Sequence, residues 1–306
     1  MQKIIKVVEV GPRDGLQNEK TLVPTPIKIE LINRLTAAGI SHLEATSFVS
    51  PKWVPQLADA AEVMHQVDRE RRIIYSALVP NLRGFQSALA AKVDEVVVFT
   101  AASEAFSQKN INCSIAESFD RFAPVALGAK EHHLRLRGSI SCALGCPYQG
   151  EVSPPAVADV VRRFRELGCD EIDIADTIGV GTAKRVKEVI YAAAQEFPIG
   201  HLAGHYHDTY GQALANVLAS LEVGISIFHS SVAGLGGCPF AEGATGNLAT
   251  EDLLYLLHGL GLPTGIDLDE VVRTGEFISK AIDRQNGSRT GCALLAKQRR
   301  EAQNRL

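Results

Sequence analysis

The run Ile4-Ile5-Lys6-Val7-Val8-Glu9-Val10 is dense in β-branched residues, and Gly11-Pro12 follows it directly. Such a run predicts a strand that is buried on both faces, as in a parallel sheet. A helix is expected next, with Thr25 as its N-cap, Pro26 at its first helical position and an apolar face that lasts until Gly39. The chain therefore begins with one strand followed by one helix.

The same unit recurs along the rest of the sequence. Further strands are expected over residues 41–46, 72–79, 93–100, 134–141, 171–175, 200–205 and 225–231, and further helices over 82–91, 115–131, 154–167, 182–196, 211–221 and 251–258. About eight alternating units require a parallel sheet, and they fit a closed barrel better than an open sheet. We therefore predict an α/β fold, a (β/α)8 TIM barrel with extra C-terminal helices. Residues 1–306 would form a single catalytic domain, with 262–306 as its helical extension.

Length and composition agree with this prediction and exclude several classes of partner. The chain has 306 residues, and a barrel of this kind typically takes about 250. Its net charge of −4 leaves no basic surface for nucleic acid, and no apolar run reaches the ~18 residues that span a membrane. No secretory leader is recognisable before the first strand, so we expect the six cysteines to be thiols in the cytoplasm.

Two histidines alternate at the end of the seventh expected strand. If His205 and His207 are extended, the period of two directs both imidazoles to the same side. Two neutral imidazoles that converge can supply two of the ligands of a divalent-metal site. The alternative is that one histidine caps a helix or packs in the core, and the other is a coincidence.

Charged residues lie where other strands end, which is where barrel enzymes carry their chemistry. Arg13 and Asp14 follow the first strand, as an electrophile beside a hard oxygen ligand or as a simple turn. Glu44 interrupts an apolar stretch, and a buried carboxylate costs several kcal/mol unless paired, so we expect an ion pair with Arg13. Asp176 ends the sixth strand as a general base, an orienting residue or a helix N-cap.

A glycine-dense segment follows the eighth strand, from Gly234 to Asn247. It is either a mobile lid with Cys238 at its turn or an ordinary connection, and it lacks the Lys-Ser/Thr of a nucleotide-binding loop. Asp14, His205 and His207, with the amide oxygen of Asn247, would leave positions open on a six-coordinate Mg²⁺ or Mn²⁺.

Seven segments resemble the family of 3-hydroxy-3-methylglutaryl-CoA lyases, which are metal-dependent barrels of the DRE-TIM metallolyase superfamily. In chain order they are VEVGPRDGLQNEK (8–20), EATSFVSPKWVPQ (44–56), KNINCSIAES (109–118), CALGCPYQG (142–150), DTIGVGT (176–182), HYHDTYGQALAN (205–216) and SVAGLGGCPFAEGATGN (231–247). Together they are highly specific and run from the first strand to the last, whereas the region after about Gly261 matches more loosely.

The resemblance implies cleavage of 3-hydroxy-3-methylglutaryl-CoA to acetyl-CoA and acetoacetate, with Mg²⁺ or Mn²⁺ bound by Asp14, His205, His207 and Asn247. Asp14 or Asp176 would accept the proton of the 3-hydroxyl group, and Arg13 would stabilise the developing negative charge. Cys238 would protonate the acetyl-CoA carbanion, and Glu44 would hold Arg13. The residues expected to touch the acyl-CoA are Arg13, Gln17, Lys109, Asn110, Ser139 and Asp173.

Two positions depart from the pattern of the family. Ser139 stands where the family usually has tyrosine, and Asp173 stands where it usually has serine. These changes are either compensated drift or a sign of another substrate, for example a related thioester such as citramalyl-CoA.

Two further alternatives concern function, and one expectation concerns assembly. The barrel could run a Claisen condensation, as isopropylmalate and citramalate synthases do, although their usual regulatory domain has no room here. It could instead be a catalytically inactive metal-binding barrel that acts as a binding protein. A homodimer is the expectation that the family provides.

Overall fold

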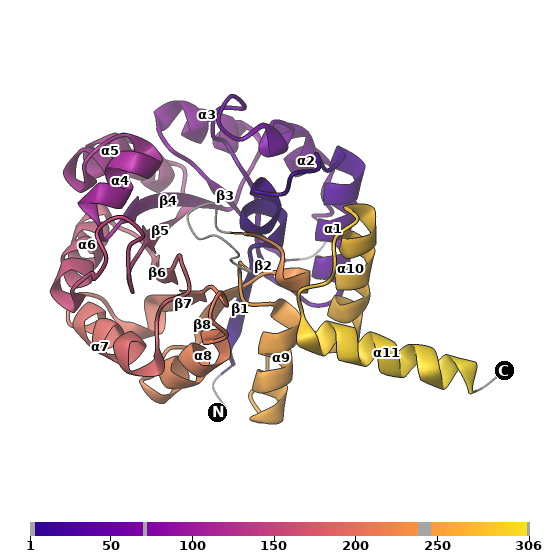
Figure 1. Cartoon of the computed structure of the whole chain (residues 1–306). Coiled ribbons are helices and arrows are strands. Elements are labelled where there is room, and N and C mark those ends of the chain that lie inside the picture. Colours follow the sequence, from indigo (N-terminus) through magenta and orange to yellow (C-terminus); the bar gives the residue numbers. More distant parts are fainter. Residues whose placement is uncertain (1–3, 70–71, 238–245, 305–306) are drawn as a thin grey trace.

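Eight parallel strands close into a barrel in chain order, β1 to β8, in a computed structural model (Figure 1). The structure describes residues 4–69, 72–237 and 246–304. The strands are β1 Lys6–Glu9, β2 His42–Ser47, β3 Ile74–Leu78, β4 Glu95–Ala101, β5 Arg135–Ser141, β6 Glu171–Asp176, β7 Leu202–Tyr206 and β8 Ile227–Ser230. The predicted TIM barrel is therefore confirmed, including its closure between β1 and β8.

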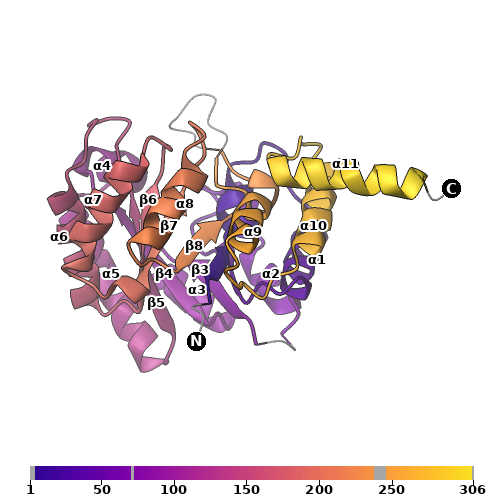
Figure 2. The same ribbon diagram turned by 90° about the horizontal axis from the view of Figure 1, so that it is seen from below.

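A ring of helices covers the outside of the barrel (Figures 1 and 2). The helices are α1 Thr25–Ala37, α2 Ala60–Gln66, α3 Leu82–Ala90, α4 Glu104–Ile111, α5 Ile115–Glu131, α6 Pro154–Leu167, α7 Ala183–Ala194, α8 Ala213–Glu222, α9 Thr250–Gly259, α10 Leu268–Ala281 and α11 Arg289–Gln303. None of these described helices has the length and apolar content to cross a bilayer.

The start of α1 differs from the prediction. Pro24 occupies the N-cap position, and Thr25 is already helical, with Pro26 next to it. The Thr25 hydroxyl donates instead to Asp59 Oδ2 at 2.8 Å. The side chain of Thr25 thus makes a tertiary contact with Asp59 and does not cap the helix.

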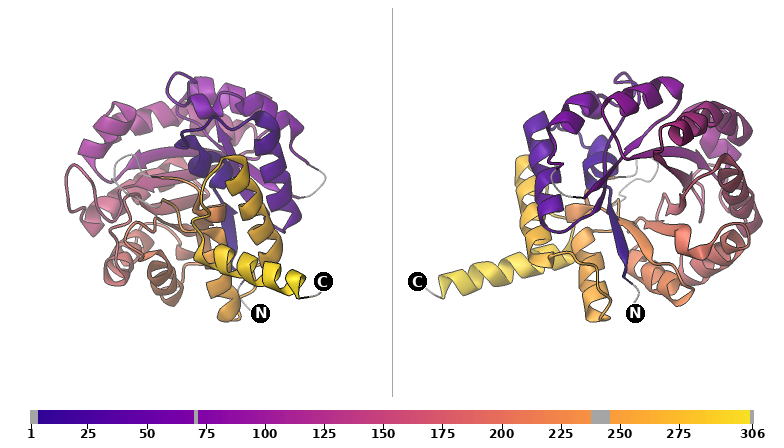
Figure 3. Two further views of the ribbon diagram at one scale, coloured as in Figure 1. Left: turned by 45° about the vertical axis from the view of Figure 1, so that its right-hand side comes forward. Right: turned by 180° about the vertical axis from the view of Figure 1, so that it is seen from behind.

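The short helices α2 and α4 were not predicted, because seven or eight residues are too few for a clear helical period. The expected C-terminal helical extension includes α11, a helix of 15 residues that projects away from the barrel (Figures 1 and 3). Only Gly291 is buried in this helix, so α11 adds little to the core.

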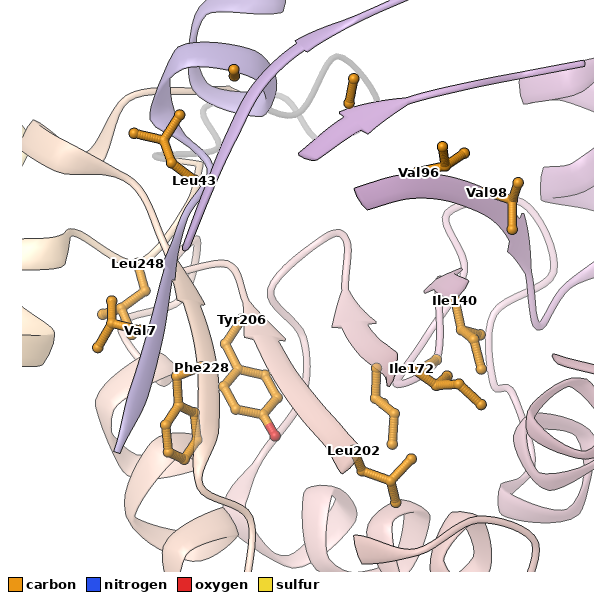
Figure 4. Packing of buried hydrophobic residues seen from close by; sticks show 14 of the residues in the cluster. Val7, Leu43, Val96, Val98, Ile140, Ile172, Leu202, Tyr206, Phe228 and Leu248 are labelled. Atoms are coloured by element: carbon orange, nitrogen blue, oxygen red, sulfur yellow. The ribbon is translucent and has the colours of Figure 1, made fainter. Parts of the chain in front are cut away.

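Alternate residues of each strand face opposite sides of the barrel wall. Figure 4 shows outward-facing residues such as Val7, Leu43 and Phe228, which belong to the large core cluster shared with the helices. Inside the barrel, a small separate cluster holds Val8, Val10, Ala203 and Ile227. The other inward positions are largely polar, and these polar residues lead to the site. They include Glu44, Glu95, Arg137, Ser139, Glu171, Asp173, His205 and His229.

Candidate metal and active site

A tight turn after β1 places Arg13 and Asp14 at the C-terminal mouth of the barrel. Residues Gly11–Gly15 form one π-helical turn, in which the carbonyl oxygen of Val10 accepts the N–H of Arg13 at 3.2 Å and of Asp14 at 2.8 Å. Gly15 closes the turn where a Cβ would lie 2.7 Å from Ser231 Oγ, so a larger residue would force this loop apart.

The turn brings Asp14 to the two histidines of β7. Ligand atoms of Asp14, His205 and His207 all lie within 4.8 Å of one another, and His205 Nε2 is 3.9 Å from Asp14 Oδ2. His205 is the penultimate residue of β7, and His207 follows the strand in an isolated bridge with Asn247. The two imidazoles thus point to the same side, as their spacing predicts, and both converge on Asp14.

Asn247 joins this set from the other side of the glycine-rich segment. Its Nδ2 donates to Asp14 Oδ2 at 2.8 Å and to the carbonyl oxygen of Leu235 at 3.2 Å. Its Oδ1 is buried without a hydrogen-bond partner, and so is Nδ1 of His207. Unpaired buried polar atoms are costly, and a cation bound among these residues would satisfy the amide oxygen. The residues present therefore fit a hard divalent ion.

The ionisation states also suit a cation. Burial alone would raise the pKa of Asp14, but Arg13, His205 and His207 outweigh it and hold this pKa well below its usual range. Burial lowers the pKa of His207 to about 4, with a further contribution from His205. One carboxylate and a neutral imidazole are therefore available as ligands at neutral pH.

Arg13 is fixed by two carboxylates. Its Nε donates to Glu44 Oε1, and its Nη1 donates to Asp14 Oδ1 at 2.7 Å. The expected pair of Arg13 and Glu44 is therefore present, and Glu44 also accepts from Nη2 of the buried Arg137. Gln17 also contacts Asp14, because its Nε2 donates to Asp14 Oδ1 at 3.2 Å.

Replacing Glu44 with glutamine is expected to destabilise the fold by about 3–5 kcal/mol, because two buried guanidinium groups would lose their shared counter-charge. Urea denaturation at neutral pH measures this change. Glu30→Gln, which breaks an exposed pair with Arg34, is the matched control and should cost at most about 1 kcal/mol. Equal effects of the two substitutions would contradict this prediction.

Ser139 and Asp173 lie inside the barrel as one pair. Ser139 Oγ donates to Asp173 Oδ1 at 2.7 Å. Asp173 also belongs to a second group, in which ligand atoms of Asp173, His205 and His229 lie within 4.8 Å of one another. His229 was not among the predicted site residues, although Ile227 and His229 follow the period of two that directs side chains into the barrel.

Asp176 and the other predicted residues are placed differently. The Asp176 carboxylate accepts the N–H groups of Val180 at 3.1 Å and Gly181 at 2.9 Å, and burial raises its pKa to about 6. It belongs to neither of the two histidine and carboxylate groups found among the described residues. Lys109 and Asn110 are exposed near the end of α4. Cys238 lies outside the described residues.

Two buried carboxylates that were not predicted from the sequence hold the segment after β8. Glu9 Oε1 accepts the N–H of Val232 at 2.9 Å, and Glu251 Oε2 accepts the N–H of Ala233 at 2.9 Å. Burial raises the pKa of Glu9 to about 7 and that of Glu251 to about 8. Both carboxyl groups therefore bind protons in the folded state at a pH where the unfolded chain has released them.

This difference predicts a loss of stability as pH rises. The contribution of Glu251 is complete below 4.5, the ordinary pKa of a glutamate side chain, and disappears as pH rises through about 8. Glu251→Gln keeps an acceptor for Ala233 but stays neutral. Relative to wild type it should gain stability as pH rises from ~4 to ~9, by on the order of 5 kcal/mol. Denaturation midpoints across this range measure the change, and the exposed Glu62→Gln serves as control. A constant difference at every pH would contradict the prediction.

A cavity of about 500 Å³ borders the site at Asn247. Its lining includes Tyr210, Arg284 and Arg289. Arg284 donates to Glu19 Oε1 at 2.8 Å and to the carbonyl oxygen of Gly234 at 3.1 Å. It therefore also holds the start of the glycine-rich segment.

The sequence and the fold both match proteins of known activity. The HMGL-like family matches this chain over residues 4–278. A 3-hydroxy-3-isohexenylglutaryl-CoA/hydroxy-methylglutaryl-CoA lyase of Pseudomonas aeruginosa is 56% identical over 97% of this chain and 99% of its own length. The mitochondrial hydroxymethylglutaryl-CoA lyase of Homo sapiens is 55% identical over 96% of this chain and 90% of its own length.

Solved structures agree with these relatives. The crystal structure of the hydroxymethylglutaryl-CoA lyase from Pseudomonas aeruginosa superposes with a TM-score of 0.95 at 56% identity, covering 97% of this chain and 99% of that one. An HMG-CoA lyase from Acinetobacter baumannii, in complex with coenzyme A and 3-methylmalate, gives 0.91 at 38% identity and covers 95% of both chains.

Proposed function

The chain belongs to the HMGL-like family, and from this premise we propose that it is a carbon–carbon lyase that cleaves 3-hydroxy-3-methylglutaryl-CoA to acetyl-CoA and acetoacetate. The observation that carries the proposal is the convergence of Asp14, His205 and His207 at the mouth of the barrel, directly beside the guanidinium of Arg13. Two relatives that are 55–56% identical over nearly the whole chain carry this activity in their names.

Asp14, His205, His207 and Asn247 would hold the metal, for which Mg²⁺ or Mn²⁺ is proposed because the set mixes hard oxygen with imidazole ligands. Such an ion, when bound, supplies Lewis acidity that lowers the pKa of a substrate hydroxyl. The buried Asn247 Oδ1, which has no hydrogen-bond partner, supports this assignment.

The chain's own groups would carry the remaining steps. A carboxylate takes the proton of the 3-hydroxyl group, and the oxygen then forms the C=O bond of the ketone at C3 as the bond between C2 and C3 breaks. The electron pair of the broken bond passes to the thioester as an enolate. Arg13, fixed by Glu44 and Asp14, is oriented to stabilise this charge. Cys238 is proposed to protonate the enolate carbon, which completes acetyl-CoA.

Asp14 and Asp176 both remain candidates for the base. Asp14 lies at the metal set, but its pKa is far below neutrality, which makes it a weak proton acceptor. Asp176 has a pKa of about 6, which is better matched to neutral pH, but its oxygens are engaged by its own loop.

The substrate contacts proposed are Arg13, Gln17, Lys109, Asn110, Ser139 and Asp173. Ser139 and Asp173 favour a second candidate, a related 3-hydroxyacyl-CoA. Relative to the tyrosine and serine usual in the family, Ser139 hydrogen-bonded to Asp173 changes both the volume and the charge of the barrel interior. The Pseudomonas aeruginosa relative is named for a second thioester as well, 3-hydroxy-3-isohexenylglutaryl-CoA.

The test compares purified protein with Mg²⁺ or Mn²⁺ on three thioesters: 3-hydroxy-3-methylglutaryl-CoA, 3-hydroxy-3-isohexenylglutaryl-CoA and citramalyl-CoA. We expect acetoacetate from the first with the highest kcat/KM. Pyruvate from citramalyl-CoA alone would move the assignment to that substrate. Metal binding without turnover of any thioester would favour the inactive barrel that acts as a binding protein.

Assembly and location are also proposals. A homodimer is proposed by analogy with the family, and sedimentation measures it. A cytoplasmic location is supported by the five cysteines of the described residues, which are thiols and not disulfides, and it is tested by cell fractionation.

A further inference from the structure

A line of buried polar side chains crosses the barrel interior toward the metal set. Lys6 Nζ donates to Glu171 Oε2 at the N-terminal end of the barrel. Glu171 Oε1 lies 3.9 Å from His229 Nε2, and His229 Nδ1 lies 3.2 Å from His205 Nδ1. His205 Nε2 then faces Asp14 Oδ2 at 3.9 Å. Glu171 and His229 are each only 2% exposed, so water does not compete for these contacts.

The contact between the two imidazoles restricts where their protons lie. Two Nδ1 atoms 3.2 Å apart can form a hydrogen bond only if one carries a proton and the other does not. His205 presents Nε2 to Asp14, so Nε2 is the nitrogen that would bind a cation there, and the proton of a neutral ring must then be on Nδ1. His229 Nδ1 must accept that proton's hydrogen bond, which leaves the His229 proton on Nε2.

The opposite arrangement would block the site. Arg137 Nη1 lies 3.4 Å from His229 Nε2 and would donate to it if that nitrogen were unprotonated. His229 Nδ1–H would then donate to His205, and the His205 proton would sit on Nε2, where the cation must bind. Glu171 Oε1 lies 3.9 Å from His229 Nε2, which is too long for a hydrogen bond, but the buried negative charge of this carboxylate favours a proton on Nε2.

We propose that His229 is a positioning residue for the metal site, because it holds His205 in the Nδ1–H form. Glu171 in turn keeps the His229 proton on Nε2. We call the contacts of Glu171, His229 and His205 the relay. The inference rests on the proposed metal-dependent function and extends it inward from the mouth of the barrel. Partners of metal-bound histidines commonly tune affinity in this way, usually as carboxylates or carbonyls. Here an imidazole takes that position, with the carboxylate one step further away.

A second cation among Asp173, His205 and His229 is the competing explanation for the same cluster. The charge nearby opposes it. Arg137 Nε lies 3.9 Å from Asp173 Oδ2, and its Nη1 lies 3.4 Å from His229 Nε2, so a cation there would face a buried guanidinium.

The experiment titrates metal-free protein with Mn²⁺ and follows free Mn²⁺ by electron paramagnetic resonance, so it does not depend on turnover. His229→Leu removes the acceptor and should weaken Mn²⁺ binding about 10–100-fold. His229→Asn places an amide oxygen near the former Nδ1 and should retain most of the affinity. His258→Leu, on the exposed surface of α9, is the matched control and should bind as wild type does.

Thermal unfolding of the metal-free proteins separates positioning from structural damage. His229→Leu should unfold at a somewhat lower temperature than wild type, because the Nδ1–H of His205 loses its acceptor, but it should remain folded at the temperature of the titration. Weak Mn²⁺ binding by a stable variant supports the proposal.

Unchanged Mn²⁺ affinity in His229→Leu would overturn the relay but leave the proposed lyase intact. Two Mn²⁺ per wild-type chain, with one lost in the variant and the other bound as tightly as before, would overturn it in favour of a second cation site. Absence of Mn²⁺ binding by wild type would overturn the metal assignment itself, and the relay with it.

Discussion

His205→Ala is expected to abolish specific Mn²⁺ binding and to lower kcat/KM for 3-hydroxy-3-methylglutaryl-CoA by about 10³-fold or more. His205 offers a ring nitrogen within 4.8 Å of the ligand atoms of Asp14 and His207, and its Nδ1 contacts His229 inside the barrel. Loss of the ion would remove several kcal/mol of stabilisation of the developing charge, and each 1.4 kcal/mol is about a tenfold change in rate.

Isothermal titration with Mn²⁺ and an acetoacetate assay measure the two effects on the same preparation. His201→Ala is the control, because His201 is exposed just before the same strand. It should retain both properties. A His205→Ala variant that still binds Mn²⁺ with wild-type affinity would show that the cation is held elsewhere.

Arg13→Lys should lower kcat by about 10²–10³-fold while Mn²⁺ binding is retained. Lysine keeps the charge but not the planar fork that Arg13 uses to contact Glu44 and Asp14 together. The stabilising charge would therefore no longer be fixed where negative charge develops, although the metal ligands remain. KM should change much less than kcat, because the lost interaction belongs to the transition state.

Steady-state kinetics combined with the Mn²⁺ titration separate these effects. Arg34→Lys, in an exposed pair on α1, is the matched control and should leave kcat unchanged. Loss of Mn²⁺ binding in Arg13→Lys would instead indicate that the arginine mainly organises Asp14.

The barrel was predictable because its signal is local. Strands such as β1 and β4 are short β-branched runs, and helices such as α5 and α6 have a capping serine and an apolar face, so much of the strand and helix order follows from neighbouring residues. The convergence of Asp14, His205 and His207 was also accessible, because all barrel strands present their C-terminal ends on one face.

Contacts across the barrel interior were not accessible in the same way. His229, Glu171 and Lys6 are far apart in the sequence, and their contacts depend on the register of β8, β6 and β1. Glu251 resembles an ordinary carboxylate of a first helical turn in the sequence, and nothing near Glu9 in the sequence indicates its partner. Both are fully buried and accept N–H groups of the segment after β8. The N-cap of α1 was mispredicted because a contact with Asp59 competes for Thr25.

The most direct test of the central claim measures acetoacetate release from 3-hydroxy-3-methylglutaryl-CoA by one preparation in three states: as purified, stripped of metal by a chelator, and reloaded with Mg²⁺ or Mn²⁺. The proposed mechanism predicts that the stripped protein is inactive and that reloading restores acetoacetate formation with equal amounts of acetyl-CoA. Undiminished release of acetoacetate by the stripped protein, or no release by the reloaded one, would contradict it.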